Sequence, residues 1–157
     1  MIAGAVIALD SSKSERTRIV LAGATAALMS GLPSTAYALC TGGDSLAATR
    51  AAGTLVPLCG GQRGMLAGAV THLAVSAGWT LVLSAVNRRC RLGMAGGLGA
   101  GALIATIDLE ILGRRYPAIR ALPRAPQWLD HLAFGVIVGA MLSRTSPRSP
   151  IEFACGH

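Results

Sequence analysis

The chain has 157 residues, of which 52% are hydrophobic and only 13% are charged. A soluble domain carries about 25% charged residues to coat its surface, so the composition excludes an ordinary soluble domain and favours one hydrophobic unit in lipid. The net charge of +7 does not indicate nucleic-acid binding. The basic residues flank apolar stretches, which is typical of membrane topology signals and of attraction to anionic lipid headgroups.

The first 18 residues form an N-terminal segment that is apolar over residues 1–9 and polar over residues 10–18. Nine apolar residues cannot cross a hydrocarbon core, which takes about 20 helical residues. We therefore expect residues 1–9 to lie at the interface or without fixed structure, and residues 10–18 to cap the helix that follows.

Residues 19–39 are the first predicted span, and Pro33 lies late in it. Proline lacks an amide donor and crowds the preceding turn, so a kink or an early helix end is expected there. A second interpretation stays open, in which residues 1–38 resemble a secretory signal cleaved after the small residues of Ala36-Tyr37-Ala38.

Residues 40–64 form a loop with glycine pairs at both ends and helix-forming residues in the middle, which predicts a short helix on the membrane surface. Cys40 and Cys59 both lie in this loop. A disulfide between them is one alternative, because the outer side of the membrane is oxidising. In the other alternative both remain free thiols that act as ordinary small buried residues. The four cysteines contain no C-x-x-C, so no zinc or redox site is predicted.

Three further spans are predicted at residues 65–86, 92–113 and 127–143, followed by a tail at residues 144–157. Residues 114–126 hold four arginines and three prolines, too polar and too broken to continue in lipid. The predicted fold is an all-α transmembrane bundle of four helices over residues 19–143, with a short interfacial helix in the first loop.

The basic residues give a weak orientation signal. A cytoplasmic N-terminus places eight of them inside, namely Lys13, Arg16, Arg18, Arg88, Arg89, Arg91, Arg144 and Arg148. Six then fall outside, namely Arg50, Arg63, Arg114, Arg115, Arg120 and Arg124. We expect an inner-membrane, multi-pass protein with both termini in the cytoplasm.

Ionisable side chains inside membrane helices are costly and need a partner or a function. The candidate intramembrane polar site consists of His72, Ser76, Asp108, Asp130 and His131. His72 and Ser76 begin a polar stripe that continues every four residues through Thr80 and Ser84, and such a stripe should face other helices or water.

Two interpretations of these side chains stay open. They form a proton relay or cation site, with His72 paired to Asp108 at similar depth, or they are structural. In the structural interpretation, Asp108 and Glu110 pair with nearby arginines, and Asp130 caps the first turn of its own helix.

Glycines recur at the small-xxx-small spacing that lets membrane helices approach closely. Gly93, Gly97 and Gly101 mark one face of the third span, which we expect to pack on the polar stripe of the second. Gly135 and Gly139 mark a second close-packing face, which His131 begins.

The sequence holds no H-E-x-x-H, G-x-S-x-G or S-x-x-K pattern, so no catalytic, metal-binding or cofactor-binding residue is predicted. The glycine-rich run 93–101 contains letters of a dinucleotide fingerprint, but no strand precedes it.

Three stretches, AGAVTHLAVSAGW (67–79), IDLEILGRRYPAIRALP (107–123) and QWLDHLAFGVIVGA (127–140), resemble small multi-pass bacterial membrane proteins of uncharacterised function. The resemblance covers about residues 19–143 and implies a four-helix membrane unit without implying an activity.

Two functions follow as hypotheses. The first is a non-enzymatic scaffold or accessory subunit that binds a further copy of the chain or another membrane protein through its glycine faces. The second is a small oligomeric transporter or channel for a proton, cation or small solute, built on the intramembrane His and Asp residues. A water-accessible cavity that reaches His72 and Asp108 would favour the second.

Overall fold

The computed structural model describes residues 2–56 and 62–143, and over these residues the protein is all-helical, without a β-strand. The predicted all-α class is confirmed. In chain order the elements are α1 (Ile2–Met29), α2 (Leu32–Thr41), α3 (Ala47–Gly53), α4 (Gln62–Arg89), α5 (Gly93–Ala105), the π-helical segment η1 (Thr106–Leu112), the 3-10 turn η2 (Gly113–Arg115), α6 (Pro117–Arg120) and α7 (Arg124–Ser143).

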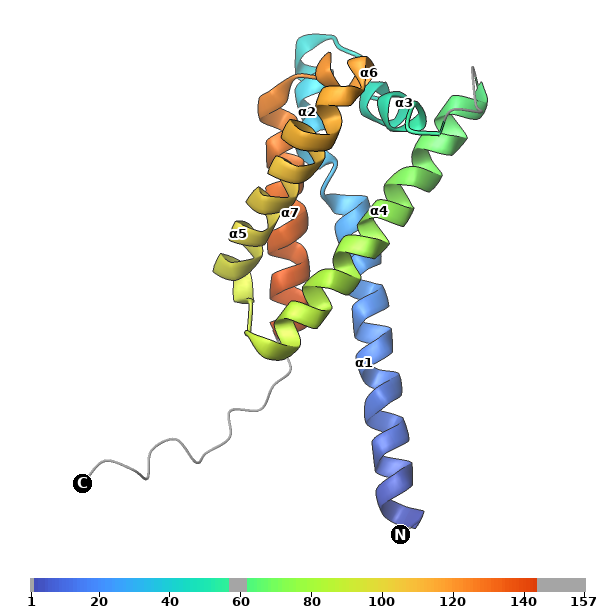
Figure 1. Ribbon diagram of the computed structural model, residues 1–157, viewed down its shortest axis with the longest axis vertical. Coiled ribbons are helices and arrows are strands. Elements are labelled where there is room, and N and C mark those ends of the chain that lie inside the picture. The colour runs from blue at the N-terminus through green and yellow to red at the C-terminus, as the bar shows by residue number, and fades with distance from the viewer. Residues whose placement is uncertain (1, 57–61, 144–157) are drawn as a thin grey trace, which may run out of the picture.

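Four long helices build the body of the molecule (Figure 1). α5 and α7 run side by side, α1 packs against α7, and α4 crosses α1 at a steep angle (Figure 1). The short helices α2, α3 and α6 gather at the end opposite the N-terminus, while the first turns of α1 extend beyond the other helices (Figure 1). The bundle therefore has one end covered by short helices and one end from which α1 projects.

The distribution of polarity suits lipid better than water. Large apolar side chains lie on the outside, with Leu66 70% and Val20 68% exposed, whereas Thr80 is 2% and Ser84 5% exposed. Hydrocarbon cannot form a hydrogen bond with a hydroxyl group, so in lipid polar side chains face the interior of the bundle and apolar side chains face outward. Within the described residues, three segments are long and apolar enough to cross a membrane, namely Ser12–Thr41, Gly64–Arg89 and Gly93–Arg115.

The first of these segments is broken where the sequence predicts it. α1 ends at Met29, and α2 begins at Leu32 with Pro33 in its first turn. Proline is tolerated there because first-turn amides have no intrahelical partner. The N-terminal segment differs from the prediction, since residues 10–18 continue α1 and do not cap a later helix.

The glycine face of α5 packs on α7, not on the polar stripe of α4 as the sequence analysis expected. A Cβ built on Gly135 would lie 2.6 Å from the amide nitrogen of Gly101, and one built on Gly139 would lie 2.9 Å from the Cα of Gly97. The two backbones touch directly, so these positions admit no side chain.

α4 meets α1 and α3 at small residues. Gly23 of α1 faces Thr80, whose hydroxyl donates to the Ser76 carbonyl at 2.7 Å. Gly53 of α3 lies against α4, where any Cβ would meet the backbone of Gly64 and Gly68. The polar stripe of α4 is thus turned into the bundle at Ser76, Thr80 and Ser84, which are all buried.

The remaining predictions on this part of the chain have mixed outcomes. The fourth helix begins at Arg124, three residues before the predicted start, and is not among the three segments named above. The first loop holds the short helix α3. Cys59 and the tail at residues 144–157 lie outside the described residues, so the pairing of Cys40 with Cys59 stays a prediction.

Candidate intramembrane polar site

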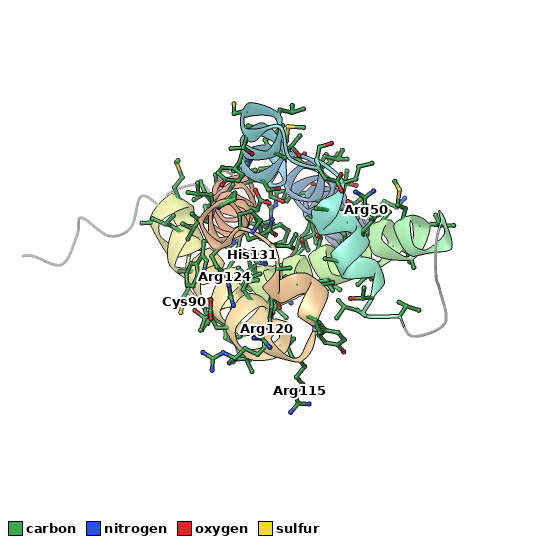
Figure 2. All side chains as sticks on the ribbon, turned by 90° about the horizontal axis from the view of Figure 1, so that it is seen from above. Arg50, Cys90, Arg115, Arg120, Arg124 and His131 are labelled. Atoms are coloured by element: carbon green, nitrogen blue, oxygen red, sulfur yellow. The ribbon has the colours of Figure 1, made fainter. Side chains whose placement is uncertain are left out.

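A cavity of about 390 Å³ lies at the end of the bundle covered by the short helices. Its wall comes from α2, α3, α4, η1, α6 and α7, and it includes the whole predicted polar site: His72, Ser76, Asp108, Asp130 and His131. Figure 2, which looks onto this end, shows His131 inside the ring of helices and Arg115 and Arg120 at its rim. The predicted site residues, which come from α4, η1 and α7, therefore meet around one space.

Asp108 lies in η1, where the helix widens into π-helical turns. Such turns are rare and often occur at functional sites. Two groups from other helices converge on the same carboxylate oxygen, Oδ2: the indole nitrogen of Trp79 donates at 3.1 Å, and Nε2 of His131 lies at 3.5 Å. Asp108 thus links α4, η1 and α7.

The imidazole of His131 has its second nitrogen fixed as well. Nδ1 lies 2.8 Å from the backbone carbonyl of Gln127, and because a carbonyl only accepts, Nδ1 must donate. A neutral ring would then present a lone pair from Nε2 to the Asp108 carboxylate. Nε2 can donate to Asp108 Oδ2 only when the ring carries a second proton, so the geometry brings a carboxylate and an imidazole together at one wall of the cavity.

Asp130 stabilises a helix other than its own. It lies in the second turn of α7 and not in the first turn as predicted, because α7 begins at Arg124. Its Oδ1 accepts the backbone amide of Ser34 at 2.9 Å, in the first turn of α2. First-turn amides are free donors, and Gly31 at the start of α2 supplies no side-chain cap, so Asp130 fills that role from a distance.

His72 plays the matching part at the end of α1. Its Nε2 lies 3.0 Å from the carbonyl oxygen of Ala27, in the last turn of α1, where carbonyls lose their intrahelical donors. His72 therefore donates from Nε2. The break between α1 and α2 is held on one side by a histidine of α4 and on the other by an aspartate of α7.

The predicted pairing of His72 with Asp108 is not what the structure has. Both residues line the cavity, but Asp108 contacts Trp79 and His131, while His72 contacts the α1 backbone. Glu110 lies outside the cavity wall and pairs with Arg124 at 2.7 Å and with Arg114 at 3.9 Å. The predicted ion pairing with nearby arginines thus applies to Glu110.

Sequence reasoning missed several residues of the wall. Ser34 offers its amide because it follows Pro33 in a new helix, and a proline inside a predicted span is the signal that could have indicated this. Gln127 is buried and lines the cavity next to His131. Tyr116 and Phe134 supply aromatic rings to the same wall.

The donor set does not form a metal centre. Among residues 2–56 and 62–143, no group of three or more His, Cys, Asp or Glu side chains is placed to hold a metal ion. No protein-family model, no curated protein and no solved structure matches this chain.

Proposed function

We propose that this chain is a small proton-coupled membrane transporter that binds a solute in the cavity lined by His72, Asp108, Asp130 and His131. One observation carries the proposal: a membrane helix is interrupted beside the cavity, and titratable side chains of two other helices hold its two broken ends. Interrupted helices at a solute site recur in secondary transporters, since free helix ends supply polar groups inside lipid.

The Asp108–His131 pair supports coupling to protons. Intramembrane acids and histidines are rare because each costs several kcal/mol, and they commonly mark proton pathways. The two side chains lie together at the wall of the solute cavity, so a solute bound there would be close to both of them.

The membrane arrangement completes the proposal. α7 has 20 residues and at 1.5 Å per residue reaches about 30 Å, enough for a fourth span. With both termini in the cytoplasm of the inner membrane, the cavity opens to the outer side, and α3 lies at that surface. Lys13, Arg16, Arg88 and Arg89 then all belong to the cytoplasmic side.

A scaffold role has less support in the packing. The glycine faces that such a role would offer to a partner lie against each other inside the chain, with Gly97 and Gly101 on Gly135 and Gly139. A partner would therefore need another surface.

Water access to the cavity is the first test. In a variant whose four cysteines are replaced by serine, Thr71→Cys places a thiol at the cavity wall and Leu73→Cys places one on the exposed apolar surface of the same helix. We expect a charged, membrane-impermeant thiol reagent to label residue 71 and to leave residue 73 unreacted in lipid. Failure to label residue 71, or labelling of residue 73 alone, contradicts the proposal.

Proton coupling is tested after reconstitution into liposomes that contain a pH-sensitive dye. We add amines, amino acids, carboxylates and sugars in turn and expect one class to change the internal pH. Asp108→Asn should abolish the change, whereas Glu110→Gln, which alters a carboxylate outside the cavity, should retain it. A pH response that persists unchanged in Asp108→Asn, or no response to any solute, contradicts the coupling.

A further inference from the structure

The charge of the cavity is opposite to the charge of the chain. The protein has 14 Lys and Arg residues against 7 Asp and Glu, yet among the described residues the cavity wall includes Asp108 and Asp130, the imidazoles of His72 and His131, and no Lys or Arg. Each carboxylate has one oxygen that accepts a hydrogen bond, Oδ2 in Asp108 from Trp79 and Oδ1 in Asp130 from the Ser34 amide. Since an anion near two carboxylates is repelled, the wall selects for a positive charge.

The rest of the wall selects for an apolar body attached to that charge. Side chains of Ile104, Leu109, Leu112, Tyr116 and Phe134 line the cavity, and Trp79 adds an indole. A volume of about 390 Å³ lies at the lower end of the range for small organic ligands, roughly 300–1,000 Å³. A bare metal ion would leave most of this apolar surface empty and would lack a third ligand.

We propose that the cavity binds a small organic ammonium ion, a protonated amine with a compact apolar body, whose charge lies between Asp108 and Asp130. The aromatic residues of the wall suit such a ligand, because a ring face near a cation is attractive. The inference rests on the proposed function and names its substrate class.

The arginines at the mouth of the cavity do not reverse this selection. Arg50 pairs with Asp44, and Arg124 and Arg114 pair with Glu110, so three positive charges near the mouth have an acidic partner. Arg115 points away from the centre of the bundle in Figure 2. In a solvated rim such charges act weakly on a ligand held deeper inside, because salt screens them.

Trp79 provides a reporter inside the site. The chain has two tryptophans, so Trp128→Phe leaves Trp79 as the only one. In this variant, purified in mild detergent, we titrate three ligands of nearly equal shape: cyclohexylamine, cyclohexanol and cyclohexanecarboxylate. We expect a saturable change in tryptophan fluorescence with the amine, and binding at least about tenfold weaker for the alcohol and the carboxylate.

Two carboxamide variants test the site of the charge. Asp108→Asn and Asp130→Asn keep an oxygen acceptor for Trp79 and for the Ser34 amide, so the fold should persist while the charge is lost. A charge-assisted hydrogen bond contributes about 1.5–3 kcal/mol, so we expect each variant to weaken amine binding roughly 10- to 100-fold. Glu110→Gln should leave the affinity unchanged, and a thermal melt verifies that each variant is folded.

The outcomes separate this inference from the proposed function. If the alcohol or the carboxylate binds as tightly as the amine, the ammonium assignment is wrong, while a solute cavity stands. If none of the three ligands binds but the impermeant thiol reagent labels Thr71→Cys, the ammonium assignment is wrong and the water-accessible cavity stands. If none binds and residue 71 is not labelled, both proposals fail.

Discussion

At its C-terminal end α7 closes against the turn between α4 and α5, whereas at its N-terminal end it borders the cavity. The closed end is defined by Asn87, Leu92, Gly93, Leu142 and Ser143. Its hydrogen bonds cap backbone groups or join two side chains. In the open end, defined by His72, Asp108, Asp130 and His131, polar side chains surround a cavity of about 390 Å³.

The closed end is compact because its polar groups satisfy one another. The Asn87 amide donates to the Leu142 carbonyl at 3.3 Å, and its oxygen accepts from the Leu92 amide at 3.0 Å and from the Ser143 hydroxyl at 3.2 Å. The Gly93 amide donates to Ser143 Oγ at 2.8 Å, and this residue has φ +57°, a conformation that favours glycine.

Side chains that cap helix ends thus serve two purposes in one bundle. Asn87 is uncharged and uses its donor and its acceptor on neighbours, so it fixes a turn. The open end uses an aspartate and a histidine for similar caps, and both side chains also line the cavity. Stability should therefore be more sensitive to changes at the closed end, and binding to changes at the open end.

The largest effect is expected between the two ends, where α5 and α7 touch. Gly135→Ala places a methyl group 2.6 Å from the Gly101 amide nitrogen and 2.8 Å from its Cα, so the two backbones must separate. Overpacking usually costs about 1–3 kcal/mol, and we expect the upper limit or more here because the neighbours are backbone atoms that cannot rotate away. A thermal melt in detergent measures it.

Gly99→Ala is the matched control for that variant. Gly99 lies in the same helix as Gly97 and Gly101, and a Cβ on it meets nothing within 4 Å. The melting temperature should stay the same or rise slightly, because alanine favours the helix over glycine. Equal destabilisation by both variants would mean that α5 and α7 do not meet at their glycine faces.

The glycine contact also shows where sequence reasoning stops. The spacing of Gly97 and Gly101 predicts that some backbone approaches closely, but it does not say which one, since two helices offered a suitable face. The same limit applies to Asp108. Asp108 lies seven residues after Gly101, and both residues lie against His131 of α7, but the spacing alone did not name that partner. No local residue pattern indicates the π-helical turns of η1.

Predictions that depended on local sequence alone agreed with the structure better than predictions of which helices pack together. Pro33 indicated the break between α1 and α2, and the apolar runs indicated the long helices. The partner of Asp130 depended instead on a helix boundary. The predicted helix began at residue 127, which put Asp130 in its first turn, whereas α7 begins at residue 124 and Asp130 lies in its second turn. Asp130 therefore caps α2 instead of its own helix, and such helix boundaries are set by tertiary packing.

The second prediction concerns the closed end. Asn87→Ala removes a donor and an acceptor at once and leaves the Leu92 amide and the Leu142 carbonyl without these contacts. We expect a loss of about 2 kcal/mol in the free energy of unfolding, since two half-buried hydrogen bonds are lost and each contributes about 1 kcal/mol. Denaturant titration in detergent measures it.

Ser143→Ala, which removes only the hydroxyl beside Asn87, should cost roughly half as much. Neither variant should alter the binding of cyclohexylamine, because both residues lie outside the cavity wall. A large change in binding with intact folding would show that the two ends are coupled.

The third prediction concerns the open end. Asp130→Ala removes the acceptor for the Ser34 amide and should destabilise the protein by about 1 kcal/mol, the usual cost of losing an N-terminal cap. Asp130→Asn keeps the acceptor and should restore most of that stability, although it should not restore amine binding. Recovery of both properties by asparagine would show that the charge of Asp130 is irrelevant.

The smallest effect is expected at His72. His72→Ala removes a single hydrogen bond, to the Ala27 carbonyl at 3.0 Å, and bonds between membrane helices average about 0.6 kcal/mol. His72 is also exposed, so little packing is lost with it. A change this small needs paired denaturant titrations of wild type and variant, and His72→Gln, which retains a side-chain N–H donor, is the control. If His72→Ala lowered the free energy of unfolding by several times this amount and His72→Gln did not restore it, the imidazole would do more than hold the end of α1. The open end would then resemble the closed end in its contribution to stability.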